Sequence, residues 1–284
     1  MEKPSQKAAL VAGGNVRGIK NAFLVIVVCF LIAVCFFLFV CGAPSHFEFE
    51  GEVGASMWFA DESIKYHPID LIGTIFKGGI IVPILQTLFL TVIVLSVERA
   101  FAISSAKGKG DITKFVKEVK ACLVKNDIAA AQALCEKQRG SVAAVVYAAL
   151  VRYKEMDENT VLSKEQKIAN LQKEVEEATA MVMPSLQQNL PIVATLTTLG
   201  TLVGLLGTVI GMIKSFQALS ASGAPDSTEL STGISEALVN TAFGIATGAF
   251  AVISYNFYTN KIDNLTYAID EIGYSIVQTF AANH

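Results

Sequence analysis

Charged side chains are scarce in this sequence. Asp, Glu, Lys and Arg make up 17% of the 284 residues, whereas an ordinary soluble domain carries about 25%. Hydrophobic residues account for 52%, so the composition indicates an integral membrane protein and excludes a typical soluble domain. The formal net charge of -3 is too small to indicate nucleic acid or an acidic substrate as a partner.

Residues that bind metals and cofactors are also few and unfavourably spaced. The five Cys are an odd number without a C-x-x-C pair, which argues against both a disulfide framework and a zinc site. The three His lie far apart in the chain. The Gly-rich segment 13–19 lacks the Lys-Ser/Thr ending and the preceding strand of a phosphate-binding loop. The sequence therefore predicts no metal, no cofactor and no enzymatic activity.

Long apolar runs are what the sequence does have. Four of them reach the length of about 20 residues that a transmembrane helix needs, at 22–42, 74–97, 190–213 and 234–257. Fourteen Lys and Arg lie from Arg99 to Lys173, Lys65 alone lies between the first two runs, and none lies between Ser215 and Glu236. By the positive-inside rule the N-terminus and the segment 99–189 are cytoplasmic, and the two short loops face out.

The fold class predicted is an all-α integral membrane protein with four transmembrane helices and a helical cytoplasmic domain. The segments 111–137 and 164–183 carry apolar residues at three- and four-residue steps, which is typical of amphipathic helices. We expect the second of them to continue into the third span, with a bend near Pro184 or Pro191. The domain boundaries follow as 1–73 for the first span and its outer loop, 74–98, 99–189, 190–258 for a helix pair, and 259–284 for a C-terminal helix.

A cleaved signal peptide is the alternative for the first run, because a basic start followed by an apolar stretch is common to both. The run is longer than a normal signal-peptide core, and neither an A-x-A site nor a good lipobox precedes Cys41, which favours a retained helix.

Polar and small residues form a stripe on each of the last two spans. At about 100° per residue, the stripe of the third span occupies roughly an 80° arc and that of the fourth roughly 140°. The members on the third span are Thr197, Thr201, Gly204, Thr208, Gly211 and Ser215, and those on the fourth are Glu236, Asn240, Thr241, Gly244, Thr247, Gly248 and Ala251.

Two interpretations apply to these stripes. Small residues four apart allow close helix packing, and this is the role predicted for Gly200, Gly204, Gly207, Gly211, Gly244 and Gly248. A ladder of hydroxyl groups along a whole span is typical of a hydrated or ion-conducting wall. Neither span carries an ionisable residue near its centre, so a proton pathway here needs a carboxylate from a partner.

The segments 204–216 (GLLGTVIGMIKSF) and 233–256 (GISEALVNTAFGIATGAFAVISYN) resemble the paired signature of the MotA/TolQ/ExbB proton-channel family, and within it ExbB most closely, together with TolQ. The resemblance covers about residues 76–280 and adds an N-terminal span to the three-span family core. It implies a homopentamer in the bacterial inner membrane, with two copies of an ExbD-like single-span partner whose Asp carries the proton. The assembly would use the proton motive force to drive a TonB-like transducer, among membrane lipid and without nucleic acid.

The resemblance also implies roles for individual residues. Glu236 and Thr241 match the family's Glu and pore-lining Thr, whereas the Thr expected on the preceding span falls at Leu199, so that its hydroxyl is replaced by Thr198 or Thr201. The predicted proton pathway comprises Thr197, Thr198, Thr201, Thr208, Glu236, Thr241 and Thr247, with Lys214 at the pore mouth. We expect Glu236 in the first turn of its helix, where the helix dipole favours a carboxylate.

Three further points stay open at the level of the sequence. Glu98-Arg99 resembles a Glu-Arg pair of the family, but a snorkelling interfacial pair is an equal alternative. The load could be that of a TolQ-like or flagellar-stator-like motor. A passive membrane scaffold, with stripes used only for packing, is the alternative from a different class.

Overall fold

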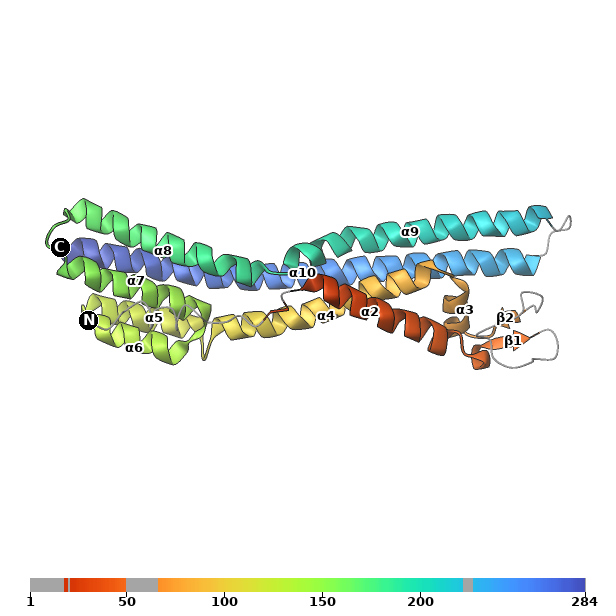
Figure 1. Ribbon diagram of the computed structural model, residues 1–284, viewed down its shortest axis with the longest axis horizontal. Coiled ribbons are helices and arrows are strands. Elements are labelled where there is room, and N and C mark those ends of the chain that lie inside the picture. Colours follow the sequence, from red (N-terminus) through yellow and green to blue (C-terminus); the bar gives the residue numbers. More distant parts are fainter. Residues whose placement is uncertain (1–17, 20, 50–65, 222–226, 284) are drawn as a thin grey trace. The chain divides into compact units, whose positions relative to one another are not determined.

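The computed structural model describes residues 18–19, 21–49, 66–221 and 227–283, and is almost entirely helical (Figure 1). It divides into two compact units. Among the described residues, the membrane unit comprises those of 21–96 and 191–255, and the bundle unit comprises 18–19, 97–190 and 256–283. The predicted outer loop at 42–73 falls partly, at 50–65, outside the described residues, as do the basic residues Lys3, Lys7, Arg17 and Lys20 that helped to predict the orientation.

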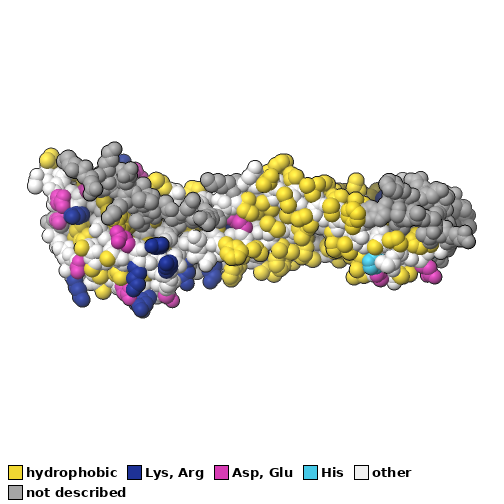
Figure 2. Space-filling model, turned by 60° about the horizontal axis from the view of Figure 1, so that its bottom comes forward, with side chains coloured by type: hydrophobic (Ala, Val, Ile, Leu, Met, Phe, Trp, Pro, Cys, Tyr) yellow, Lys and Arg dark blue, Asp and Glu magenta, His cyan; other side chains and the backbone are white. Residues whose placement is uncertain are grey.

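Four helical stretches in the described part of the chain are long and apolar enough to cross a bilayer. They cover Ala22–Cys41, Ile81–Val124, Lys164–Gln217 and Gly233–Asn283, and each overlaps one of the predicted apolar runs. The all-α membrane fold with four spans is thereby confirmed. On the face shown in Figure 2, hydrophobic side chains cover the membrane unit, and Lys, Arg, Asp and Glu gather on the bundle unit.

The membrane unit is built from the first span, a broken second span and the helix pair. Its first helix buries residues four apart, Val25, Cys29, Ala33, Phe37 and Cys41, and leaves most of its other side chains exposed. Beyond it, a two-stranded antiparallel hairpin pairs Phe47 with Pro68. The elements are α2 (Ala22–Phe36), η1 (Phe37–Cys41), η2 (Pro44–His46), β1 (Phe47–Phe49), β2 (Tyr66–Pro68), α3 (Leu71–Lys77) and the start of α4 (Ile81–Lys107).

The second span differs from the expected single helix that begins at residue 74. Asp70 caps α3 by accepting a hydrogen bond from the Gly73 amide, and the chain then turns through Gly79, whose φ of 73° suits a residue without Cβ. Helix α4 begins only at Ile81. The turn is closed by the stacked rings of Phe37 and Phe76, with centroids 4.8 Å apart.

The bundle unit holds the helices α5 (Ile112–Val124), α6 (Ile128–Gln138), α7 (Gly140–Glu158) and α8 (Lys164–Gln187), together with the C-terminal parts of α4 and α10. The predicted continuous helix at 111–137 is split, because Asn126 turns the chain with a φ of 55° and Asp127 caps α6. Ser163 and Gln166 form the capping box that begins α8.

The core of the bundle unit is apolar, and its residues recur along the chain at the spacing of helical turns. The C-terminal part of α10 buries residues at steps of three and four, from Ile262 through Ile269 and Ile276 to Phe280. The ring of Phe280 meets that of Tyr153 on α7 edge to face, with centroids 5.0 Å apart. At its rim, Lys120 and Glu271 form an ion pair of 2.5 Å.

The last two helices are longer than predicted. Helix α9 spans Leu190–Ala221 and α10 spans Ser227–Asn283, so the connection expected at 217–232 shrinks to residues that lie outside the described part. Helix α10 is also continuous through residue 258, where the prediction placed a boundary between the span and a separate C-terminal helix. The expected single rod of α8 and α9 is interrupted, between the two prolines, at Gln188 and Asn189, and Asn189 has a φ of 64°.

Candidate functional site

The polar and small residues of the two stripes face each other where α9 and α10 lie side by side (Figure 1). A Cβ atom on Gly244 would lie 2.6 Å from the carbonyl oxygen of Gly200 and 2.7 Å from the Cα of Gly204. Such distances are shorter than real Cβ contacts allow, so the backbones touch because these residues are glycine. We call this contact between α9 and α10 the seam.

The seam continues toward the end of α9 and the start of α10. A Cβ on Gly207 would lie 2.6 Å from the Cβ of Asn240, and one on Gly211 would lie 2.8 Å from the Cβ of Ala237. In the other direction, a Cβ on Gly248 would lie 2.7 Å from the hydroxyl oxygen of Thr201. All six glycines predicted for packing therefore lie in the seam.

Threonine hydroxyls along the stripes are mostly bonded to their own helix. Each donates to a carbonyl oxygen three or four residues earlier, as polar side chains in apolar surroundings commonly do. The bonds run from Thr197 to Val193 (3.4 Å), from Thr201 to Thr197 (3.3 Å), from Thr208 to Leu205 (2.6 Å) and from Thr247 to Phe243 (2.8 Å). Their hydrogen-bond donors are therefore occupied, and their oxygen atoms accept no hydrogen bond from the described residues.

Thr241 differs from these residues because its hydroxyl crosses the seam. It donates to the carbonyl oxygen of Gly204 on α9 over 3.2 Å, and no Cβ on Gly204 blocks the approach. Thr241 is thus both a polar group of the predicted pathway and a direct bond between the two helices.

Exposure separates the predicted pathway residues into three groups. Thr247 is fully buried in the seam, and Thr198 is exposed on α9. The other five are half-buried: Glu236, and at the seam's edge the four threonines Thr197, Thr201, Thr208 and Thr241. Leu199, where the family pattern has Thr, is 41% exposed. A helix that packs along the edge of the seam would reach four hydroxyl oxygens of this chain.

Glu236 lies half-buried at the end of the membrane unit where α9 ends and α10 begins. Two cations act on it electrostatically, Lys77 from α3 and Lys214 from α9. The Nζ of Lys214 lies 3.6 Å from the position that a Cβ on Gly79 would take, so the three charges gather around the α3–α4 turn. The expected neighbourhood of Glu236 and Lys214 is present, and Lys77 is an addition that the sequence alone did not indicate.

The expectation that Glu236 lies in the first turn of its helix was wrong. Helix α10 begins at Ser227, more than two turns earlier, and the helix dipole acts mainly within the first turn. The charge of Glu236 is therefore balanced by the two lysines and not by the helix end.

Asn240 belongs to the same stripe and was assigned no role from the sequence. It is 2% exposed, and its Nδ2 donates to the carbonyl oxygen of Gly78 over 3.3 Å. Its Oδ1 has no hydrogen-bond partner among the described residues. Asn240 thus joins α10 to the α3–α4 turn. Its position one helical turn after Glu236, on the same face, is the signal that could have indicated this role.

A second polar cluster lies in the bundle unit. Arg99 is fully buried and pairs with Glu98 through two hydrogen bonds of 2.5 and 2.7 Å. Arg99 also donates to the carbonyl oxygens of Ser185 and Leu186 in the last turn of α8, and so caps a helix end that has no further intrahelical partners. The pair is a buried structural element and not a snorkelling interfacial pair.

The fold and the seam define an integral membrane protein of four apolar helices, with a tightly packed polar helix pair. The sequence model of the MotA/TolQ/ExbB proton channel family matches residues 138–271, which include all of the seam. This match confirms, over that region, the resemblance seen in the sequence. The family is one of proton channels and not of enzymes.

Several curated proteins align with part of the chain. The Tol-Pal system protein TolQ of Haemophilus influenzae is 38% identical over 79 residues, which are 28% of this chain and 35% of TolQ. The biopolymer transport protein ExbB of Aquifex aeolicus is 34% identical over 83 residues, 29% of this chain and 56% of that protein. ExbB of Helicobacter pylori is 37% identical over 81 residues, with shares of 28% and 56%. The chain thus matches between about a third and just over half of the length of these relatives.

Proposed function

We propose that this chain is the channel-forming subunit of an ExbB-like, proton-driven motor in the bacterial inner membrane. The single observation that carries the proposal is the seam: a close-packed helix pair with half-buried hydroxyls at its edge, in a chain of this family. Five such pairs in a ring would present Thr197, Thr201, Thr208 and Thr241 to a common axis. The topology predicted from the Lys and Arg distribution places Glu236 at the outer end of this pathway.

The described spans supply hydroxyl groups but no mid-span acid. Hydroxyls pass a proton along but do not retain one at neutral pH, so a partner helix with a carboxylate completes the pathway. Two copies of an ExbD-like single-span partner are proposed for this role. A proton crossing about 100 mV supplies roughly 2.3 kcal/mol, so several protons are needed for each mechanical step on a TonB-like transducer.

Proton flux in reconstituted vesicles tests the proposal. The chain alone is expected to stay closed, and flux is expected only when the ExbD-like partner is present. Glu236→Gln should lower the flux while leaving assembly intact, because the amide retains the shape of the side chain and loses its charge. Equal flux with and without the partner would contradict the proposed division of roles, and no flux under either condition would favour a passive scaffold.

A TolQ-like load is the second candidate, and the similarity to TolQ of Haemophilus influenzae supports it. The two loads differ in the transducer that must be present for force to be delivered. Reconstitution of the chain and its partner with either a TonB-like or a Tol-type transducer, followed by cross-linking under a proton gradient, separates them. A gradient-dependent cross-link with one transducer only assigns the load.

A further inference from the structure

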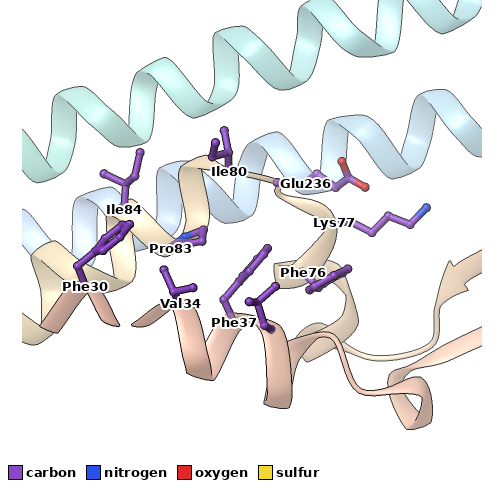
Figure 3. A pocket seen from close by; sticks show the side chains of 11 residues that line it. Phe30, Val34, Phe37, Phe76, Lys77, Ile80, Pro83, Ile84 and Glu236 are labelled. Carbon is purple, nitrogen blue, oxygen red and sulfur yellow. The ribbon is translucent and has the colours of Figure 1, made fainter. Parts of the chain in front are cut away.

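A groove runs along the membrane unit between α2 and the α3–α4 turn (Figure 3). Its volume is about 800 Å³, within the range of ligand-binding pockets. One wall carries Phe30 and Val34 from α2 and Phe37 from η1, and the facing wall carries Pro83 and Ile84 from α4. The groove exists because the second span is broken: α3 ends at Lys77, and the chain turns before α4 starts.

The groove is apolar along its length and polar at one end. Figure 3 shows Lys77 and Glu236 together at that end, and Phe30 and Ile84 toward the other. Lys77 and Lys214 both act electrostatically on Glu236, so the formal charges of these three described residues sum to +1 at the polar end. An occupant that complements this site has an apolar chain and an anionic head.

The apolar side chains that line the groove are partly exposed, so a molecule from outside the chain can reach them. Phe30 is 45% exposed, Ile84 is 37% exposed, and Ile80 at the turn is 78% exposed. Basic pockets between transmembrane helices bind anionic lipid head groups, and here an apolar groove leads away from such a pocket. A bilayer surrounds these helices with phospholipids, and an anionic phospholipid has both an apolar chain and an anionic head.

We propose that this groove binds an anionic phospholipid, with an acyl chain between α2 and α4 and the phosphate at Lys77. The first span is the extra element relative to the three-span core, and it supplies one whole wall of the groove. The lipid would therefore fill the space between this added helix and the core. The proposal is independent of the motor function, because it concerns binding and not proton movement.

Lipid titration of the full chain tests the proposal. The protein is purified in a non-ionic detergent and stripped of co-purified lipid. It is then titrated with phosphatidylglycerol or phosphatidylcholine of identical acyl chains, and adducts are counted by native mass spectrometry. Phosphatidylglycerol is expected to bind more tightly. Lys77→Gln should weaken its binding about tenfold, because a charge-assisted hydrogen bond to phosphate is lost, and Lys77→Arg should retain most of it.

Filling the groove supplies the second variant. Val34→Trp places an indole between the walls and should weaken the binding of both lipids. Ile84→Trp repeats the test from the opposite wall in case one variant fails to fold. Leu202→Trp, on a residue of α9 that is 57% exposed, is the matched control and should bind lipid as the parent does.

Three results would overturn the proposal. The first is equal binding of the two lipids by the parent protein, and the second is unchanged binding in Lys77→Gln. The third is a change in the number of associated chains in Val34→Trp with no change in lipid adducts, which would assign the groove to contact with a neighbouring copy.

Discussion

Replacing Thr241 by Val separates the packing role of the seam from its predicted role in proton transfer. The substitution replaces a hydroxyl by a methyl group at nearly constant volume, and it removes the hydrogen bond of 3.2 Å from Thr241 to the Gly204 carbonyl. Hydrogen bonds between transmembrane helices contribute about 0.6 kcal/mol on average. The contact between α9 and α10 should therefore weaken only about threefold, and the assembly of chains should change by no more than that.

Proton transfer should respond far more strongly than assembly. A positioned group that passes a proton contributes roughly a hundredfold or more in rate, so a loss of flux of that size is expected in Thr241→Val. Flux is measured in vesicles that contain the chain and its partner, with a pH-sensitive dye, and the number of associated chains is measured by native mass spectrometry. The two magnitudes differ enough to be distinguished in one preparation.

Two further variants complete this experiment. Thr241→Ser keeps the hydroxyl and should restore most of the flux. Thr87→Val is the matched control, because Thr87 donates to its own helix at the Pro83 carbonyl (2.6 Å) and lies outside the predicted pathway. Flux in Thr241→Val within about threefold of the parent value would show that the hydroxyl serves packing alone.

Three other predictions follow from the contacts described. Gly244→Leu should lower the thermal midpoint and the yield of assembled protein, because its Cβ would lie 2.6 Å from a carbonyl oxygen of α9. Arg99→Gln should cost about 3–5 kcal/mol in the free energy of unfolding, since it leaves a buried carboxylate unpaired, whereas Lys173→Gln should change it by less than about 0.5 kcal/mol because its ion pair is exposed. Burial raises the pKa of the Cys135 thiol to about 12, so maleimide at pH 8 should modify the half-buried Cys122 first.

The outcomes that contradict these three predictions are equally direct. A parent-like thermal midpoint in Gly244→Leu would mean that the helices are not in contact at this residue. Equal unfolding free energies for Arg99→Gln and Lys173→Gln would mean that the buried pair does not cap α8. Faster modification of Cys135 than of Cys122, read by mass spectrometry, would mean that the α6 thiol is not enclosed.

The sign of the pH dependence at Cys135 follows from the same burial. The folded chain retains the thiol proton to a higher pH than the unfolded chain, whose thiol has the ordinary pKa of 9.0. The neutral thiol's contribution to stability is therefore complete below pH 9.0 and is lost as the pH rises toward about 12.

The spans and the seam could be predicted from the sequence because both depend on the spacing of residue types along the chain. Glycines and hydroxyls at steps of three and four fall on one face of a helix whatever its surroundings, and two such faces that lie side by side meet through their small residues. Gly204 and Gly244 were assigned to packing on that basis, and the structure places their backbones in contact. The proton pathway, in contrast, stays a prediction.

The breaks between helices could not be predicted in the same way. Gly79, Asn126 and Asn189 each turn the chain with a positive φ. A Gly or Asn within an apolar or charged run occurs in continuous helices as well as at breaks, so the local sequence does not distinguish the two. The start of α10 was also placed too late, because residues from Ser227 onward are polar and resembled a loop. Because of that error, Glu236 was expected in the first turn of its helix, whereas the helix begins more than two turns earlier. The groove beside Lys77 depends on one of these breaks, and so it was not foreseen.

The direction of the threonine hydrogen bonds has a consequence for the proposed partner. Thr197, Thr201 and Thr208 each direct their proton into their own helix, and so they present only lone pairs outward. A protonated carboxyl group that docks at the seam's edge finds acceptors for its O–H, whereas the same group after losing its proton finds no donor from these residues. The edge of the seam would therefore bind the neutral acid more tightly than the anion. Each deprotonation would favour release of the partner from one subunit, and each protonation would favour binding to the next.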